Sequence, residues 1–222
     1  MKDNTTTYMR IGEEAVCLNA LYIFYPKQWL DNKVIDVYSK ALIQYFDTQH
    51  RTRPDKEKIV LTDVFACQYI GRAFNVWTRN MSSSGGDLKV VNSKLILIPW
   101  NFNDNHWVLY AVTFKGRKIY IYDSMVDAKI VNALKKKKLS PGHQLIEDQI
   151  STILPKILIW RDFVDNSSPP TGKEANDYGL NFKWTTRFGK CPMQPNSYDC
   201  RVYMLAFMDN LLREIKFPDL LD

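Results

Sequence analysis

The sequence predicts a single α+β domain, because helical and strand patterns occupy separate stretches of one chain. A helical pattern comes first, two strands around a tight turn lie in the middle, and a helix, a strand and a last helix follow. The 222 residues suffice for one large hydrophobic core. No internal repeat and no convincing linker divides the chain, so we expect residues 1–222 to form one domain with a flexible stretch at 1–14.

In the first third of the chain, apolar residues recur near helical spacing from Trp29 to Phe46, which predicts a helix. The charged stretch from Thr48 to Lys58 is typical of a loop. Thr62 can cap a second helix that continues to Phe74. The stretch from residue 82 to 87, rich in Ser and Gly, indicates a flexible connection.

The middle of the chain changes to the period of β-strands. Leu95 to Pro99 is a short apolar run, and Trp107 to Phe114 alternates with many β-branched and aromatic residues. A turn at Lys115-Gly116-Arg117 leads into a further strand from Lys118 to Asp123. Two strands around a tight glycine-containing turn predict a β-hairpin and therefore antiparallel sheet.

The last third of the chain alternates between helix, loop and strand. A helix is predicted from Gln144 towards Ile159, in which Pro155 should cause a kink or a break. The stretch from Asp165 to Tyr178 has the Ser, Pro, Gly and Asn content of a loop. Phe182 to Phe188 predicts a strand, and Cys200 to Glu214 predicts a helix.

Composition excludes several classes of protein. Hydrophobic residues make up 45% and aromatic residues 13%, which is too apolar for a disordered, collagen-like or coiled-coil chain. There is no unbroken run of about eighteen apolar residues, as a membrane span would need, and the first ten residues lack the apolar core of a signal peptide. We therefore expect a soluble intracellular protein, in the nucleus or the cytoplasm.

The cysteines and histidines show no pattern of a disulfide framework or a metal site. Four cysteines include no CxxC pair, and three histidines lie among them without zinc spacing. Cys17, Cys67 and Cys191 are expected to be core thiols. His50 and His143 lie in polar stretches and are expected to be solvated.

The charge balance does not by itself identify a partner. Thirty basic and 24 acidic side chains give a net charge of +6, which suits an acidic protein or a nucleic acid. The basic run from Lys135 to Lys138 has no accompanying aromatic or glycine pattern, so it is expected to be a solvated face. We therefore do not expect nucleic acid to be a partner.

Four residues have the types and positions of a cysteine-based catalytic site. His106 precedes one strand of the hairpin and Asp123 ends the other, so pairing around the turn should bring them together, where the acid can fix the imidazole tautomer. A loop histidine and a turn-capping aspartate are the alternative. Cys200 begins a helical pattern, where the helix dipole favours thiolate. Gln194, six residues earlier, could direct its amide at a developing oxyanion.

Four segments of the chain, in this order, resemble those of the ubiquitin-like-protein (SUMO/sentrin-specific) cysteine proteases. They are Trp29 to Ile35, His106-Trp107, Tyr122-Asp123-Ser124 and the stretch from Gln194 to Cys200. The resemblance implies a papain-like fold, with a central mixed or antiparallel sheet flanked by helices. It also implies isopeptidase or endopeptidase chemistry, in a catalytic domain that can be part of a longer protein.

The resemblance assigns a role to each residue of the candidate site. Cys200 would be the nucleophile, His106 the general base and then acid, and Asp123 the group that orients His106. Gln194 would form the oxyanion hole with the Cys200 backbone N–H. The implied reaction needs neither metal nor organic cofactor. The implied partner of a monomeric enzyme is a ubiquitin-like modifier, SUMO first, together with its conjugates.

The resemblance also assigns substrate-binding residues. In that family two tryptophans enclose a narrow tunnel for the Gly-Gly tail of the modifier, and Trp29 and Trp107 occupy those places; only glycine lets a backbone pass between two indoles. Without the resemblance, both tryptophans would be expected to fill the core. Asp31 and Asn32 occupy the place of an Asn-Asp pair whose acid contacts the modifier, and here the order is inverted.

A second departure concerns the residue after the catalytic cysteine, where the family usually has Gly and this chain has Arg201. Its side chain would either crowd the site or favour the thiolate by its charge. Two alternative functions follow. A thioester resolved by an amine would make the protein an acetyltransferase of the same clan. A dead site would leave a binding module that holds the modifier without cutting it.

Overall fold

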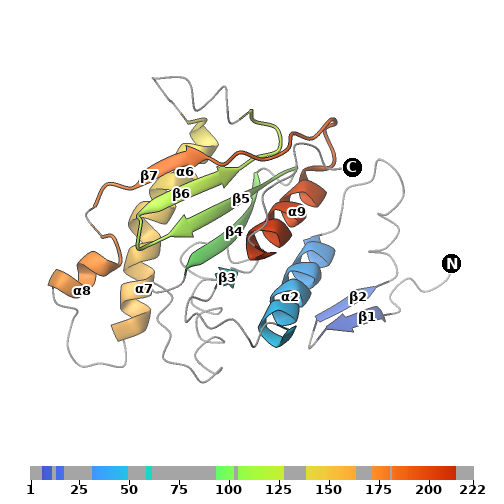
Figure 1. The fold of residues 1–222 in the computed structure, drawn as a ribbon, viewed down its shortest axis with the longest axis horizontal. Coiled ribbons are helices and arrows are strands. Elements are labelled where there is room, and N and C mark those ends of the chain that lie inside the picture. The colour runs from blue at the N-terminus through green and yellow to red at the C-terminus, as the bar shows by residue number, and fades with distance from the viewer. Residues whose placement is uncertain are drawn as a thin grey trace.

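The computed structural model describes residues 7–11, 14–17, 32–49, 59–61, 94–102, 105–127, 139–163, 172–180 and 182–213. Within these residues a five-stranded mixed sheet forms the centre, and helices lie against both of its faces (Figure 1). This arrangement confirms the predicted α+β class with a central mixed sheet flanked by helices.

The strands of the sheet follow one another in chain order. Their bounds are β3 (Ile59–Leu61), β4 (Leu95–Phe102), β5 (His106–Thr113), β6 (Lys118–Tyr122) and β7 (Thr185–Phe188). The three central strands are antiparallel, and the two outer strands each run parallel to their neighbour. The predicted hairpin is therefore the middle of the sheet, with Thr113 opposite Lys118 in its last pair.

The helices form one layer on each side of the sheet. Helices α6 (Pro141–Asp148) and α7 (Leu154–Phe163) lie on one face, and α9 (Cys200–Arg213) with α2 (Asn32–Gln49) lies on the other (Figure 1). A short helix, α8 (Gly172–Asp177), follows α7. None of the helices in the described ranges is both long and apolar enough to cross a bilayer.

Alternation along β5 supplies both halves of the core. Val108, Tyr110 and Val112 join a buried cluster with Ile146 and Leu158 from the α6–α7 side. The residues that alternate with them, Trp107, Leu109 and Ala111, pack in a second buried cluster that also contains α2 and α9 side chains. Since successive side chains of a strand point to opposite faces, His106 at the start of β5 shares the face of Val108 and Tyr110, and Trp107 shares the face of Leu109.

A π-helical turn at Gln149–Ile153 joins α6 and α7. Pro155, which has no N–H to donate, lies directly after this turn, at the place where the sequence predicts a kink or break. Ile146, Ile150, Leu154 and Leu158 are all buried, although a spacing of four drifts around an ideal α-helix. The wider π turn corrects that drift and keeps the four side chains against the sheet.

Some elements differ from the expectation. The N-terminal stretch expected to be flexible contains β1 (Thr7–Ile11), which pairs with β2 (Glu14–Cys17). Helix α8 occupies part of the predicted loop from 165 to 178. Helix α6 begins at Pro141, three residues before the predicted start, because Pro is favoured in the first turn and Ser140 caps the helix end. The second predicted helix, from 62 to 74, lies outside the described residues.

Candidate active site

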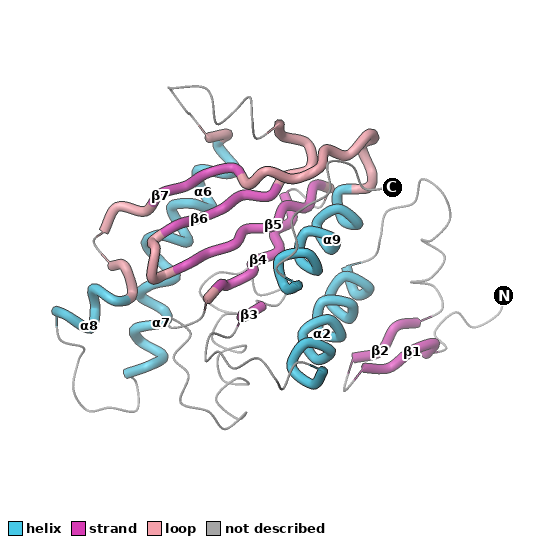
Figure 2. Tube along the Cα trace, viewed as in Figure 1, coloured by secondary structure: helices cyan, strands magenta, loops and turns pink. Residues whose placement is uncertain are grey.

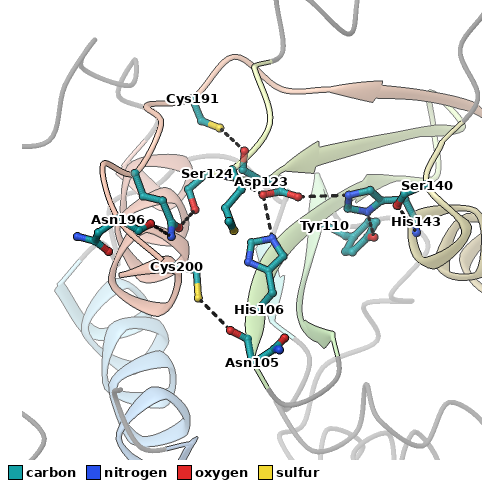
Figure 3. A network of polar contacts seen from close by, with 12 residues as sticks. Asn105, His106, Tyr110, Asp123, Ser124, Ser140, His143, Cys191, Asn196 and Cys200 are labelled. Carbon is teal, nitrogen blue, oxygen red and sulfur yellow. Dashed lines mark hydrogen bonds and ion pairs between the residues drawn. The ribbon is translucent and has the colours of Figure 1, made fainter. Parts of the chain in front are cut away.

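Three side chains from distant parts of the sequence meet at one end of the sheet (Figure 3). His106 opens β5, Asp123 follows β6, and Cys200 opens α9. In an antiparallel hairpin the start of one strand lies beside the end of the other. His106 Nε2 accordingly lies 2.9 Å from Asp123 Oδ1, which is the proximity that the hairpin predicts.

Cys200 comes to this point from the opposite layer. The loop from 189 to 199 runs from the end of β7 to the first turn of α9 (Figure 2). The Cys200 thiol is buried and lies 3.7 Å from the carbonyl oxygen of Asn105, the residue before His106. The Nδ1 atom of His106 is buried without a hydrogen-bond partner in the described part of the chain, and it lies on the side of the ring that faces Cys200 (Figure 3).

Electrostatics favours charged forms of all three groups. Burial lowers the pKa of His106, but hydrogen bonding to Asp123 and the neighbouring Cys200 outweigh it and raise this pKa to about 9. Burial raises the pKa of Asp123, whereas its histidine partners and the Met125 backbone N–H hold that pKa well below its usual range. Burial also opposes the Cys200 thiolate, yet His106 and the Trp107 backbone lower the pKa of Cys200. The site is therefore suited to a thiolate–imidazolium pair.

Arg201, which follows the thiol, is buried beside Trp107. Its guanidinium carbon lies 6.0 Å from the centre of the Trp107 ring, as in a cation–π contact. Its positive charge is one of the causes that lower the pKa of Cys200. Of the two effects left open by the sequence, the structure therefore supports assistance to the thiolate.

Gln194 is held in one orientation by its neighbours. The Ser124 hydroxyl donates to Gln194 Oε1 at 2.5 Å, and Gln194 Nε2 donates to the carbonyl oxygen of Asn196 at 2.5 Å. The Gln194 backbone N–H also donates to the Ser124 carbonyl, at 2.9 Å. An amide nitrogen carries two hydrogens, and the bond to Asn196 uses one of them. The amide can therefore direct its other hydrogen at a ligand.

The loop before Cys200 is organised by one asparagine side chain. Asn196 Oδ1 accepts from the backbone N–H groups of Tyr198 and Asp199, each at 3.0 Å. Asn196 Nδ2 donates to the Asp199 carboxylate at 2.5 Å. This asparagine turn brings the chain into α9, whose first turn closes with the Tyr203 N–H donating to Asp199 O. Cys200 thus lies at the amino end of a helix.

The predicted substrate-binding residues are not brought together by the described part of the structure. Trp107 is 1% exposed and packs in the same buried cluster as Cys200, which is the core position that the sequence offers as an alternative. Asn32 is half-buried at the start of α2. Trp29 and Asp31 lie outside the described residues. A tunnel between the two tryptophans therefore stays a prediction.

One residue of the site was missed by the sequence analysis. His143, expected to be solvated, is buried on α6, with Nε2 3.3 Å from Asp123 Oδ2 and Nδ1 2.6 Å from the Tyr110 hydroxyl. The signal that could have found it is the helix start at Ser140-Pro141, which places His143 in the first turn, above the sheet.

A pocket of about 410 Å³ adjoins the site on the α6 side. Its polar lining consists of His106, Asp123, Ser140 and His143, and its apolar lining includes Phe102, Met125, Val126, Leu139 and Phe188. Among the residues that the structure describes, no group of three or more His, Cys, Asp or Glu side chains is arranged so that it could hold a metal ion.

Known proteins resemble this chain over most of its length. The model of the family described as "Ulp1 protease family, C-terminal catalytic domain" matches residues 28–221, which is most of the chain.

The chain belongs to the Ulp1 protease family.

Relatives of this family match the chain in both sequence and fold. Ubiquitin-like-specific protease ESD4 of Arabidopsis thaliana is 24% identical over 216 residues, covering 89% of this chain but 34% of that protein. The chain thus spans about a third of the length of that relative. Ubiquitin-like-specific protease 1 of Saccharomyces cerevisiae is 22% identical over 179 residues, covering 81% of this chain and 22% of that protein.

Among solved structures, the fold is similar to that of the SUMO protease Ulp1 with its catalytic cysteine oxidized to a sulfenic acid. The TM-score is 0.64 at 18% identity, with 98% of this chain and 80% of that chain covered. The likeness to these Ulp1-like folds confirms the predicted papain-like fold class.

Proposed function

We propose that the protein is a cysteine protease that cleaves after the Gly-Gly terminus of a ubiquitin-like modifier, SUMO first. The observation that carries the proposal is the buried thiol of Cys200 beside a histidine whose far nitrogen is tied to Asp123 at 2.9 Å. Membership of the Ulp1 family and relatives named as ubiquitin-like-specific proteases support the class of substrate.

The first half of the reaction forms a thioester. The Cys200 thiolate attacks the carbonyl carbon of the terminal glycine, and the carbonyl oxygen becomes an oxyanion. The second amide hydrogen of Gln194 and the Cys200 backbone N–H stabilise that oxyanion. The His106 imidazolium then gives its proton to the departing amine, the C–N bond breaks, and the thioester remains on Cys200.

The second half of the reaction releases the enzyme. His106, now neutral, takes a proton from water while the water oxygen attacks the thioester carbonyl. The C–S bond breaks, the thiolate of Cys200 returns, and the modifier leaves with a free carboxylate. Asp123 holds the same ring nitrogen of His106 through both halves, so the ring keeps its tautomer.

Modifier recognition would involve the residues implied by the family. Trp29 and Trp107 would select the glycine tail by excluding side chains, and Asp31 and Asn32 would contact the folded part of the modifier. For Trp107 this requires that the indole, 1% exposed in the structure, form one wall of the tunnel as well as part of the core.

Intact-mass detection of covalent adducts tests the proposal. SUMO, ubiquitin and related modifiers that carry C-terminal electrophiles are incubated with the wild type and with Cys200→Ala. We expect one modifier to form a single adduct that is lost in the variant, while circular dichroism shows both proteins folded. A folded wild type without any adduct would contradict the protease and direct attention to acetyl transfer or a binding module.

A further inference from the structure

His143 is a buried titratable side chain that the proposed reaction does not use. It lies on α6, on the far side of Asp123 from His106, and the two histidines hold opposite oxygens of the same carboxylate (Figure 3). Oδ1 of Asp123 accepts from His106 and from the Met125 backbone N–H, at 2.9 and 2.8 Å. In the described part of the chain, Oδ2 has His143 as its side-chain donor, at 3.3 Å.

The protonation of this chain of groups follows from its ends. An ionised carboxylate only accepts hydrogen bonds, so His143 Nε2 carries a hydrogen and donates it to Asp123. Burial raises the pKa of Tyr110 well above its usual value, so the phenol keeps its hydrogen. The Tyr110 hydroxyl lies 2.6 Å from Nδ1, so a hydrogen bond holds the second ring nitrogen of His143 as well.

Packing fixes the ring of His143 as well as its hydrogen bonds. Its ring makes edge contacts with Phe102 and Phe188, with centroids 5.2 and 5.4 Å apart. Tyr110 adds a third edge contact from β5. In the described part of the chain, the charge of Glu147, one turn further along α6, also acts on Tyr110, and its carboxylate accepts from Thr186 of β7 at 2.7 Å. His143 is thus held by neighbours from three elements.

We propose that His143 is a positioning residue, which holds the Asp123 carboxylate and through it the catalytic orientation of His106. With donors on Oδ1 alone, the Asp123 carboxylate would be less restrained against rotation about its Cβ–Cγ bond, and such a rotation would displace the His106 ring. The donor at Oδ2 prevents this rotation and stabilises the ionised form of Asp123. The inference rests on the proposed function, because His106 and Asp123 are given their roles there.

The test uses paired substitutions at His143 that differ in reach. The amide nitrogen of His143→Gln lies close to where Nε2 was and can still donate to Asp123. His143→Asn places its amide where Nδ1 was and cannot reach Asp123. His143→Phe keeps a ring of similar shape without any donor, and Gln144→Ala, an exposed neighbour on α6, is the control.

The readout is the rate at which iodoacetamide alkylates Cys200, measured from pH 4 to pH 9, and it needs no modifier. With Asn or Phe at position 143, we expect a rate at neutral pH on the order of tenfold lower, as for loss of a hydrogen bond to a charged group. The rise of the alkylation rate on the acid side of the pH profile should also move to higher pH, because Asp123 then takes up its proton more readily. We call this rise the acid limb. Gln at position 143 and the Gln144→Ala control should keep the wild-type limb.

Equal profiles for the Gln and Asn variants would overturn the proposal, since a purely structural role would not distinguish their reach. If neither variant folds, Tyr110→Phe decides, because it removes one oxygen and with it the hydrogen bond to His143 Nδ1. A smaller shift of the acid limb in the same direction supports the proposal, and an unchanged limb refutes it. Failure of the modifier-adduct assay with normal alkylation profiles would count against the proposed substrate alone.

Discussion

At the scale of single residues, the Asp123 carboxylate links two histidines, and one of them, His106, lies beside the buried thiol of Cys200. Asp123 is placed by its backbone at the end of a central strand, and its two oxygens reach different histidines. The charge on this carboxylate supports the imidazolium of His106, which in turn supports the thiolate of Cys200. In the proposed reaction, the reactivity of Cys200 therefore depends on a carboxylate that does not itself contact the substrate.

For the proposed reaction, the raised pKa of His106 predicts where activity is lost at alkaline pH. The ring stays protonated until the pH passes about 9, and only the protonated ring can give a hydrogen to the departing amine. We expect kcat/KM for cleavage of a modifier–fluorophore conjugate to fall above that pH. Asp123→Asn should move this alkaline fall in kcat/KM down towards pH 6.5, the ordinary pKa of histidine. An unchanged pH dependence would show that the fall is not due to His106.

Ser124 acts on the oxyanion side of the site. Its hydroxyl donates to Gln194 Oε1, so Ser124→Ala removes one of the two side-chain hydrogen bonds that orient the Gln194 amide. We expect kcat for cleavage of a modifier–fluorophore conjugate to drop by roughly 3- to 10-fold with KM nearly unchanged, since the lost contact matters most in the transition state. Ser197→Ala, exposed in the same loop, is the matched control, and an equal loss there would refute the role.

At the scale of elements, the site lies where the hairpin, the loop after β7 and two helices from opposite layers converge. The loop approaches the hairpin closely at Gly189, whose N–H donates to Ile121 O at 2.8 Å. A Cβ on Gly189 would lie 2.2 Å from the Tyr122 ring, which packs against Phe207 of α9. Only glycine at position 189 allows the loop to come this close to Tyr122, the residue before Asp123.

Gly189→Ala should therefore destabilise the fold by about 1–3 kcal/mol, as overpacking does. Gly172→Ala is the matched control, since a Cβ there meets nothing within 4 Å. Urea unfolding measures both. The explanation by overpacking would be wrong if the two variants were equally stable.

Local patterns in the sequence predicted the elements that carry the candidate catalytic residues. The period-two hairpin brought His106 to Asp123, and the apolar periodicity after 200 placed Cys200 at a helix start. The partner of Asp123 on α6 was missed, because Pro141-Gly142 has the composition of a turn although Pro also begins helices. The parallel pairings of β3 with β4 and of β7 with β6 join segments that are distant in the sequence, so no local pattern predicts them.

At the scale of the whole molecule, the ionised core of the site links stability to pH. The folded protein lowers the pKa of Asp123 below its ordinary value of 3.8, so its contribution to stability is present above that pH and is lost as the pH falls. We expect the free energy of unfolding in urea to fall more steeply between pH 5 and pH 3 for the wild type than for Asp123→Asn. Parallel curves would show that other carboxylates dominate.

The two layers of helices also give the molecule two different tolerances to a change in chain length. Between α6 and α7, the π-helical turn at Gln149–Ile153 holds one residue more than an α-helix would need there. Deleting one residue of that turn leaves Ile146 and Leu154 seven positions apart, which an α-helix keeps nearly in phase. Deleting one residue within α9 would rotate the rest of that helix by about 100° and turn its buried side chains towards water. The α6–α7 layer, which holds His143, can therefore accommodate a one-residue deletion, whereas helix α9, which begins at Cys200, cannot.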